Sequence, residues 1–497
     1  MIDAPRQSDN VLAGSKLRGM EGRDTARPHV IILGAGPAGV GAAWQVAQRG
    51  LARVTVLEQR DGFGGNAGSF DLEGLRVDYG SHRLHPACDP AILRDLQALL
   101  GDDLLDRPRH GRIRLGGRWI HFPLKPVDLF LRVPPKFALG VAGDLARKLL
   151  PESNGQPESF ATILERGLGR TICREFYFPY ARKLWGLAPP DLAPIQAQRR
   201  VSGNSIGKML RKLANAVPGL KRPGAGRFFY PRHGYGQISE RIAEAAATAG
   251  AEFIHGAKVT GVDCEGGRVH AVRFERNGAE QVLTADHVWS TLPVGLLLRS
   301  LRPAPPADVL AAAGKISFRG MILIYLVLEQ EQFTEYDAHY FPSEDIRISR
   351  LSEPKNYSVS AEPRGRTILC AELPADPGSP EWAMTDEELG RALVGWLGQA
   401  GLPVTAPVLR VVTKRLGQAY PVYRTGFQEH LQKLDEYAAR IEGLLLFGRQ
   451  ALFAHDNTHH ALFMAYSAAD CLSSDGNFDN ARWAEFRKVF DTHVVED

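Results

Sequence analysis

The chain has 497 residues, of which 44% are hydrophobic and 23% are charged, and its 60 Lys and Arg residues nearly balance 56 Asp and Glu residues, leaving a net charge of +4. This composition is that of a folded globular protein, and it excludes a disordered chain, which would combine low hydrophobicity with high net charge. The small charge also excludes a nucleic-acid binder that depends on bulk basic charge. At about 100–200 residues per domain, the length predicts two or three domains.

Residues 1–27 are polar and contain no apolar core of a secretory signal, so we predict a disordered leader. No apolar run approaches the roughly 20 residues that cross a bilayer. The longest run, Met321–Leu328, has the length of a buried strand. No C-x-x-C pair occurs, so neither a disulfide framework nor a zinc cluster is expected from the five cysteines, which are Cys88, Cys173, Cys264, Cys370 and Cys471. These features predict a cytoplasmic protein.

The first predicted unit is a strand, a helix and a second strand within about thirty residues. An apolar strand over 30–33 is followed by a helix over 37–48, and the second strand, 53–57, ends in Glu58. Between the first strand and the helix lie the glycines of a G-x-G-x-x-G motif, Gly34, Gly36 and Gly39. This order is typical of a dinucleotide-binding unit.

Each part of this motif has a physical role. Gly34 makes the tight turn, Gly36 lets the backbone approach a pyrophosphate, and Gly39 lets the helix pack close to the strand. The pyrophosphate then lies at the helix N-terminus, where free N–H groups and the helix dipole favour anions. Glu58, nineteen residues beyond Gly39, is placed to accept hydrogen bonds from a ribose.

Further along the chain, residues 126–222 are expected to be rich in helices, with strands over 268–274, 287–290, 316–328, 367–372 and 444–447 and helices over 384–400 and 458–472. We therefore predict a nucleotide-binding domain built from residues 28–110, 225–300 and 430–497. The remaining stretches, 111–224 and 301–429, are expected to form a second, substrate-binding domain.

A second glycine cluster, within Gln59–Ser69, follows Glu58. This loop, together with the C-terminal strand, Gly448-Arg449 and the helix after them, resembles the FAD-containing superfamily of amine oxidases, protoporphyrinogen oxidases and UDP-galactopyranose mutases. The resemblance implies an α/β fold, with a Rossmann-like FAD-binding domain of discontinuous segments and a mixed α+β substrate domain with a helical insertion. Thr458 is the expected N-cap of the last helix, whose positive end would face the flavin. The implied FAD-binding residues are Gly34, Gly36, Pro37, Ala38, Gly39, Glu58, Gln59, Gly64, Gly65, Asn66, His82, Val259, Gly448, Arg449 and Thr458.

Within that superfamily, the segments Asp78–His85 and Tyr180–Gly186 resemble UDP-galactopyranose mutases. The resemblance implies that Trp185 meets a uridine and that a set of arginines and a tyrosine clamps a diphosphate, because the planar fork of arginine suits phosphate oxygens. The implied substrate-binding residues are Trp185, Arg199, Arg319, Tyr420 and Asn457.

The chain departs from the mutases after Gly448-Arg449. Where the mutases carry a tyrosine and an aspartate, this sequence has His455 and Asn457, followed by His459 and His460. We expect the three histidines, His455, His459 and His460, to be acid or base groups, or else polar loop residues. No metal site is expected at His82 and His85, because no further ligands lie near them in the sequence.

Two functions remain open, and a flavin-binding protein without catalysis is disfavoured by the arginines. The first is an FAD-dependent oxidoreductase that works through flavin N5 on a phosphorylated, sugar-linked substrate. Dioxygen or a nicotinamide would then complete the cycle, and NAD(P)H is the expected external reductant wherever the flavin has to be reduced. The alternative is a redox-neutral, mutase-like ring contraction in which reduced FAD is the nucleophile. The expected partner is a small molecule, and no nucleic-acid partner is expected. A homodimer is compatible with the sequence, as is peripheral membrane contact through a helix near 134–150, although a solvated helix is favoured there.

Overall fold

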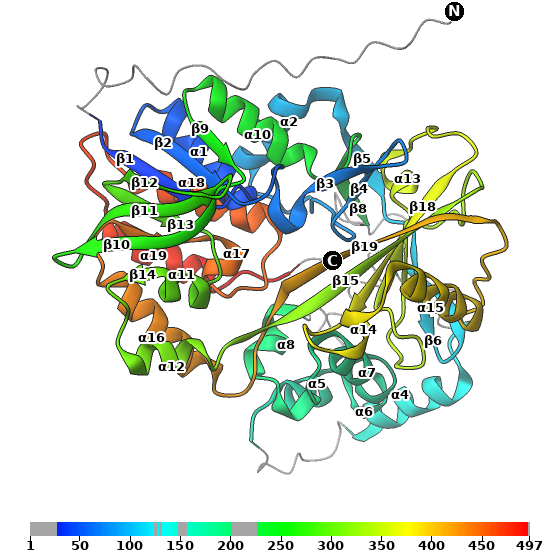
Figure 1. Ribbon diagram of the computed structural model, residues 1–497. Coiled ribbons are helices and arrows are strands. Elements are labelled where there is room, and N and C mark those ends of the chain that lie inside the picture. Colours follow the sequence, from blue (N-terminus) through cyan, green and yellow to red (C-terminus); the bar gives the residue numbers. More distant parts are fainter. Residues whose placement is uncertain (1–26, 124–127, 129–131, 148–156, 201–225, 496–497) are drawn as a thin grey trace, which may run out of the picture.

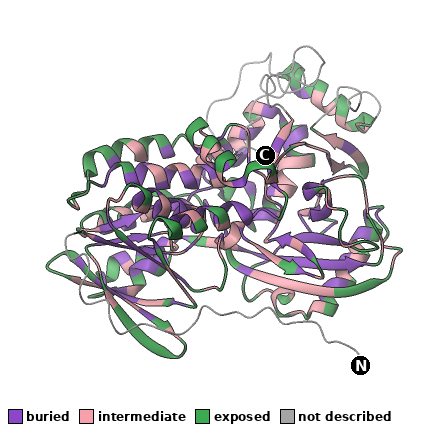
Figure 2. Ribbon diagram, turned by 90° about the horizontal axis from the view of Figure 1, so that it is seen from above, coloured by how far each residue is buried: buried purple, intermediate pink, exposed green. Residues whose placement is uncertain are grey.

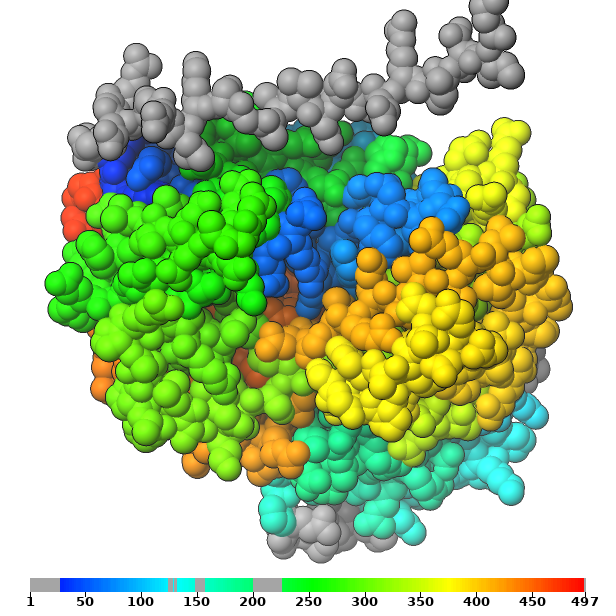
Figure 3. All heavy atoms as spheres, in the orientation of Figure 1, coloured from blue at the N-terminus to red at the C-terminus, as the bar shows by residue number. Residues whose placement is uncertain are grey.

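The computed structural model describes residues 27–123, 128, 132–147, 157–200 and 226–495 (Figure 1). Nearly all of the predicted leader lies outside the described residues, as does part of the predicted helical region 126–222. The chain forms two halves that lie side by side. Buried residues follow the strands of both halves (purple in Figure 2), and Figure 3 shows a recess between the halves, with blue N-terminal residues deep inside it.

The first half is built on a five-stranded parallel sheet of strand order β20-β13-β1-β2-β9. Its strands come from segments far apart in the chain: β1 (His29–Leu33), β2 (Arg53–Glu58), β9 (Glu252–His255), β13 (His287–Ser290) and β20 (Leu444–Leu446). All five residues of β1 are buried, as expected for a parallel strand covered on both faces. This confirms the predicted Rossmann-like sheet made from discontinuous segments.

Alternate residues of β1 pack into two different cores. Val30 and Ile32 face a core shared with three helices, α1 (Pro37–Gln48), α10 (Gln237–Thr248) and α18 (Thr458–Asp470). Ile31 and Leu33 face the opposite core. That side is covered by a four-stranded sheet and helices, namely β10 (Lys258–Glu265), β11 (Arg268–Arg276), β12 (Ala279–Thr284), β14 (Leu301–Arg302), α11 (Val294–Ser300), α12 (Ala307–Ala313) and α16 (Phe427–Ala439).

The second half is built on a seven-stranded sheet of order β19-β15-β18-β17-β16-β6-β7. Its strands are β6 (Gly111–Leu115), β7 (Arg118–Phe122), β15 (Ser317–Leu328), β16 (Ala338–Tyr340), β17 (Arg350–Ser352), β18 (Thr367–Pro374) and β19 (Val408–Val422). The apolar run Met321–Leu328 is the buried part of β15, between β18 and β19, so the predicted strand is confirmed. The domain boundaries themselves stay a prediction.

Helices cover both faces of this sheet. One face packs on the helical region that includes α5 (Phe160–Leu168), α6 (Arg170–Ile172), α7 (Phe178–Trp185) and α8 (Pro194–Arg200). The other face packs on α15 (Asp386–Gln399), whose first turn has a capping box between Thr385 and Glu388. Helix α4 (Pro135–Arg147) lies at the outer edge, with Leu139 and Leu145 exposed.

Short elements join the two halves. A hairpin of β3 (Ser69–Leu72) and β4 (Leu75–Asp78), the pair β5 (Leu104–Pro108) and β8 (Arg227–Pro231), and the helices α2 (Pro90–Leu100) and α13 (Pro354–Ser358) lie along the junction (Figure 1). Within the described residues, no helix is long and apolar enough to cross a membrane. The preference for a solvated α4 over one that contacts a membrane stays a prediction.

Candidate flavin and substrate cavity

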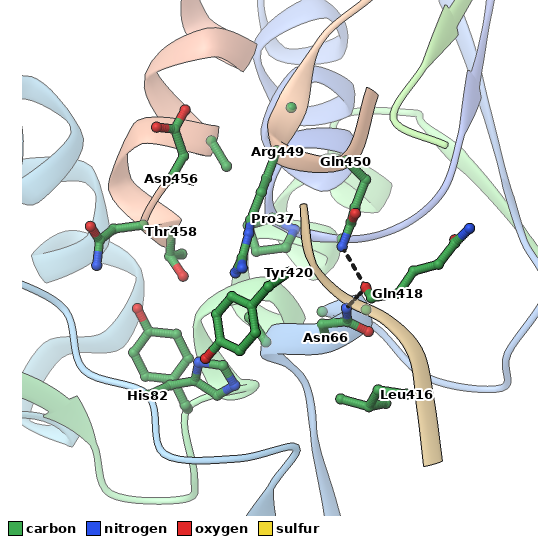
Figure 4. A pocket seen from close by; sticks show the side chains of 18 of the residues that line it. Pro37, Asn66, His82, Leu416, Gln418, Tyr420, Arg449, Gln450, Asp456 and Thr458 are labelled. Atoms are coloured by element: carbon green, nitrogen blue, oxygen red, sulfur yellow. Dashed lines mark hydrogen bonds between the residues drawn. The ribbon is translucent and has the colours of Figure 1, made fainter. Parts of the chain in front are cut away.

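A cavity of about 690 Å³ lies between the two halves and takes residues from both. From the first half come the turn after β1, the end of β2, the second glycine loop and the start of α18. From the second half come β16, β17, β18, β19 and α7. In Figure 4, Tyr420 and Arg449 lie together in the middle of the cavity, with Asp456 and Thr458 on one side and Asn66, Gln418 and Gln450 on the other.

The turn between β1 and α1 forms an open cradle. Gly34, with φ +98°, starts the turn, and a Cβ on Gly39 would lie 1.9 Å from the carbonyl oxygen of Gly34, so only glycine lets α1 pack this close. At Gly36, in contrast, an added Cβ would meet nothing within 4 Å. Helix α1 begins at Pro37 without a side-chain cap, so its first N–H groups remain available to an anion.

The carboxylate of Glu58 is oriented by the same turn. Its Oε2 accepts from the backbone N–H of Ala35 at 2.8 Å, and its Oε1 accepts from the N–H of Arg60 at 2.9 Å. Glu58 lies at the end of β2 and lines the cavity. This is the position expected of a carboxylate that binds ribose hydroxyls.

The second glycine loop packs on the first. The N–H of Gly64 donates to the carbonyl oxygen of Ala35 at 2.9 Å, and both Gly64 and Gly65 have positive φ. Asn66 Nδ2 and Gln450 Nε2 both donate to the carbonyl oxygen of Gln418, at 3.1 and 3.0 Å. These contacts bring together the N-terminal loop, β19 and the segment after β20, as Figure 4 shows.

The start of α18 also lines the cavity, through Asn457, Thr458 and Ala461. The predicted cap is wrong by one residue: Asn457, with extended backbone, is the N-cap, and Thr458 is the first helical residue. The reason is local, because Nδ1 of His460 accepts from the backbone N–H of Asn457 at 3.2 Å and so holds the chain extended at that position. The helix dipole still points its positive end towards the cavity.

These features fit FAD. An uncapped helix N-terminus, the open space beside Gly36 and a backbone-oriented carboxylate match the pyrophosphate and ribose of a dinucleotide. Most of the residues predicted to bind cofactor line the cavity, namely Gly34, Gly36, Pro37, Ala38, Glu58, Gln59, Gly64, Gly65, Asn66, His82, Gly448, Arg449 and Thr458. Gly39 does not line the cavity, because its role is to let α1 pack closely against the turn. Val259, in β10, is not among the lining residues.

Of the five residues predicted to bind substrate, Tyr420 and Asn457 line the cavity, but Trp185, Arg199 and Arg319 do not. Arg319 forms an ion pair with Asp376 and donates to the carbonyl oxygen of Pro374 at 3.2 Å. Arg199 pairs with Asp491 at 2.8 Å. Trp185 is buried against Phe160, with ring centroids 5.6 Å apart.

Five arginines that the sequence analysis did not single out line the cavity instead, namely Arg60, Arg83, Arg109, Arg350 and Arg415. Arg83 donates to the hydroxyl oxygens of Tyr340 and Tyr357, at 2.9 and 3.0 Å. Arg350 pairs with Glu372 at 2.7 Å. Burial opposes the charge of Arg350, but Glu372 raises its pKa well above the ordinary value, so it remains a cation. Two signals were available in the sequence, because Arg60 belongs to the glycine cluster Gln59–Ser69 and Arg83 belongs to the Asp78–His85 segment.

The three histidines predicted to be catalytic are not among the residues that line the cavity. Burial, followed by neighbouring histidines, lowers the pKa of His459 to about 4 and that of His460 to about 2, so both are neutral at physiological pH. His455 is buried and its ring lies 4.7 Å from that of Tyr423. A catalytic role for these histidines stays a prediction.

Asp456, which lines the cavity, and His460 and His493, which do not, bring three ligand-type atoms within 4.8 Å of one another. Nδ1 of His493 lies 3.3 Å from Oδ2 of Asp456, and the rings of His460 and His493 stack at 4.1 Å with 13° between their planes. Nitrogen lone pairs lie in the ring plane, so two nearly parallel, stacked rings do not point them at one common centre. The expected absence of a metal site stays a prediction.

The geometry is that of a dinucleotide-binding α/β protein whose cavity is lined by more arginines than acidic residues. The family described as flavin-containing amine oxidoreductases matches residues 37–471, and the chain belongs to this family of flavin enzymes.

Similar proteins include a phytoene dehydrogenase of Streptomyces griseus, 28% identical over 316 residues that span 56% of this chain and 57% of that protein. A coproporphyrinogen III oxidase of Propionibacterium freudenreichii subsp. freudenreichii is 24% identical over 84% of this chain and 86% of its own. Among solved structures, a reduced UDP-galactopyranose mutase has a TM-score of 0.76 at 21% identity, covering 89% of this chain and 93% of that one. At this identity, the structural likeness supports the fold alone.

Two glycine substitutions should separate cofactor binding from folding. In Gly36→Ala the new methyl group enters the open cradle, so we expect apoprotein stability to be unchanged and FAD affinity to fall by about tenfold or more. Gly39→Ala forces the methyl group onto the oxygen of Gly34 and should destabilise the apoprotein by about 1–3 kcal/mol. Fluorescence titration with FAD and urea unfolding would measure both effects.

Gly62→Ala is the matched control, since Gly62 lies in the second glycine loop, which packs on the cradle, has open space around it and does not line the cavity. It should bind FAD as the wild type does. Unchanged FAD affinity in Gly36→Ala would contradict the assignment of the cradle.

The buried histidines should make the protein sensitive to acid. Because the folded-state pKa values of His459 and His460 lie below 6.5, their contribution to stability is complete above pH 6.5 and is lost as the pH falls towards 4. In that pH window, each histidine should add about 1.4 kcal/mol per pH unit to the fall in the free energy of unfolding. Urea unfolding at several pH values should show a shallower slope for His459→Gln, but a wild-type slope for substitution of the exposed His270.

Proposed function

We propose that this protein is an FAD-dependent oxidoreductase that acts through flavin N5 on a phosphorylated, sugar-linked substrate. The observation that supports this most is the charge of the cavity. Three acidic residues line it, Glu58, Glu372 and Asp456, against six arginines, Arg60, Arg83, Arg109, Arg350, Arg415 and Arg449. The pyrophosphate of FAD would balance part of this excess, and an anionic substrate would balance the remainder.

Hydrogen bonds orient several of these arginines. Arg83 donates to two tyrosine hydroxyls, and Arg449 donates to the carbonyl oxygen of Ala419 at 2.9 Å while its guanidinium lies 5.2 Å from the ring of Tyr420. A guanidinium carries five N–H donors, so an arginine oriented in this way can also make charge-assisted hydrogen bonds to phosphate oxygens.

Bound FAD would supply a two-electron acceptor for a substrate C–H bond. The protein contributes orientation and charge. The N-terminal turn of α18 favours negative charge near Asn457 and Thr458. His82 stacks on Tyr235 at 5.3 Å, and burial lowers the pKa of its imidazole, so that a neutral ring lines the cavity. The two halves bring these groups together around one substrate.

Two comparisons favour a redox reaction: a relative named as a dehydrogenase and one named as an oxidase. The second candidate is mutase-like chemistry, in which the flavin must first be reduced, with NAD(P)H as the proposed external reductant. This candidate is favoured because the cavity wall includes Tyr180, His82 and Tyr420. These residues lie in or beside segments that resemble UDP-galactopyranose mutases.

One experiment separates the two candidates. Oxidised and dithionite-reduced holoprotein would each be incubated without oxygen with UDP-galactopyranose and with a panel of other nucleotide sugars. We expect a nucleotide sugar to bleach the oxidised flavin absorbance, and no furanose to form. Furanose produced only by the reduced protein would instead establish the mutase reaction. If neither occurs with any nucleotide sugar, the proposed substrate class is wrong.

A matched pair of arginine variants tests the substrate side. Arg109 lines the cavity, whereas Arg319 is paired with Asp376 outside it. Arg109→Gln should weaken the binding of UDP-galactopyranose to oxidised holoprotein by about tenfold or more, the worth of one charged hydrogen bond. Arg319→Gln should change it less than about twofold. Calorimetric titration would measure both, and the reverse order would show that the substrate lies elsewhere.

A further inference from the structure

Glu372 is a buried carboxylate that uses only one of its two oxygens. It lies on β18, in the middle of the seven-stranded sheet, and its side chain is 5% exposed. Oε1 accepts three hydrogen bonds, from the backbone N–H of Ser81 at 2.8 Å and from Nε and an Nη of Arg350 at 2.9 and 2.7 Å. Among the described residues, Oε2 has no hydrogen-bond partner, although Glu372 lines the cavity.

The crowding at Oε1 fixes the direction of Oε2. Gly80 has φ +102°, and a Cβ at this position would lie 3.2 Å from Oε1, so the loop that carries Ser81 is pressed against this oxygen. Arg350 approaches the same oxygen from β17, the neighbouring strand. The loop and the guanidinium enclose Oε1. Oε2 is not among the fully buried polar atoms that lack a partner, so Oε2 is the carboxylate oxygen that faces the cavity.

An acceptor that faces a cavity can accept from water or from a ligand, and a carboxylate oxygen is a strong acceptor. Arg350 and Ser81 satisfy one oxygen, and a ligand donor would satisfy the other. Such a donor must be a neutral or positively charged hydrogen-bonding group, because a phosphate oxygen would be repelled.

Two arginines share this part of the cavity wall with the acceptor. Arg350 contacts Glu372 directly, and Arg83 is linked to it by a chain of hydrogen bonds. The chain runs from Ser81 Oγ to the hydroxyl of Tyr357 at 2.6 Å, from Tyr357 to Arg83 at 3.0 Å, and from Arg83 to the hydroxyl of Tyr340 at 2.9 Å. Tyr340 lies opposite Arg350 in the register of β16 and β17. Guanidinium groups of this kind suit an anion.

From this juxtaposition we infer that Glu372 Oε2, together with Arg83 and Arg350, forms a subsite for a phosphate ester that carries a free hydroxyl group close to the phosphate. The arginines bind the phosphate, and Oε2 accepts the hydrogen of the hydroxyl. The inference rests on the proposed function and narrows its substrate class. It makes Glu372 a residue that determines specificity, by rejecting anions that lack the donor.

The test uses three phosphate esters of similar size with oxidised holoprotein: 2-hydroxyethyl phosphate, 2-methoxyethyl phosphate and ethyl phosphate. Calorimetry should show that the wild type prefers the hydroxyl ester over ethyl phosphate by about tenfold, the worth of a hydrogen bond to a charged group. The methoxy ester accepts but cannot donate, and should bind no better than ethyl phosphate.

Glu372→Gln should remove most of the preference for the hydroxyl ester. Ser81 and Arg350 need an oxygen, so they keep the amide oxygen on their side and turn the NH₂ group, a donor, towards the cavity. The hydroxyl preference should then fall below about threefold, and the methoxy ester should gain affinity. Glu280→Gln, on the exposed strand β12, is the control and should behave as the wild type does.

The failures of the two proposals differ. If no ester binds to the wild type, the phosphate site of the proposed function is wrong. If all three bind equally, and equally to Glu372→Gln, the phosphate site stands and the subsite is refuted. If Glu372→Gln does not fold or does not retain FAD, Glu372→Asp replaces it in the test. Aspartate keeps a carboxylate for Arg350 to pair with, and its side chain, shorter by one methylene, moves the second oxygen away from the cavity. It should lose the hydroxyl preference and keep the affinity for ethyl phosphate, and an unchanged preference would refute the subsite.

Discussion

The two halves of the molecule depend on one buried carboxylate, that of Asp78. It accepts hydrogen bonds from Ser69 Oγ at 2.6 Å, the hydroxyl of Tyr230 at 2.7 Å and the N–H of Tyr235 at 2.8 Å, and the carbonyl oxygen of the same residue accepts from the hydroxyl of Tyr325 at 2.6 Å. Burial raises the pKa of Asp78, and nearby His82 and these hydrogen bonds oppose the rise. Tyr325 belongs to the seven-stranded sheet, and Tyr235 precedes α10 of the parallel-sheet half. These hydrogen bonds therefore hold Asp78 in place, and the segment that follows it carries His82 and Arg83 into the cavity wall.

Each half supplies what the other lacks. The parallel-sheet half provides backbone donors, glycines and the carboxylate of Glu58, all suited to a dinucleotide. The seven-stranded half supplies Arg350, Arg415 and the hydroxyl of Tyr340, with Arg350 and Tyr340 on adjacent strands, and these add to Arg60 and Arg449 of the parallel-sheet half. A flavin held by the first half would thus face a substrate held by the second, and the recess between them gives access (Figure 3).

Prediction from the sequence succeeded where structure is set locally. The helix predicted over 37–48 has the same bounds as α1, and the strand predicted over 287–290 is β13, because apolar runs, glycine turns and helix stops act over a few residues. The position of Arg319 shows what the sequence could not predict. It pairs in register with Tyr420 on β19, yet its guanidinium reaches Asp376, while Arg350 reaches the cavity. Which arginines converge depends on the register of strands separated by many residues, and side chains alternate between the faces of a sheet.

The charge of the cavity bears on how a chain with a net charge of only +4 could bind the anionic substrate proposed above. Among the cavity arginines, Arg83, Arg415 and Arg449 donate to hydroxyl or carbonyl oxygens, and Arg350 pairs with Glu372. These oxygens orient the guanidinium groups on the cavity wall. Burial strengthens the attraction between a guanidinium and an anion, since fewer water molecules screen it. Selectivity for an anion would therefore follow from the excess of arginines over acidic residues in this one cavity, and the total charge of the chain would have little part in it.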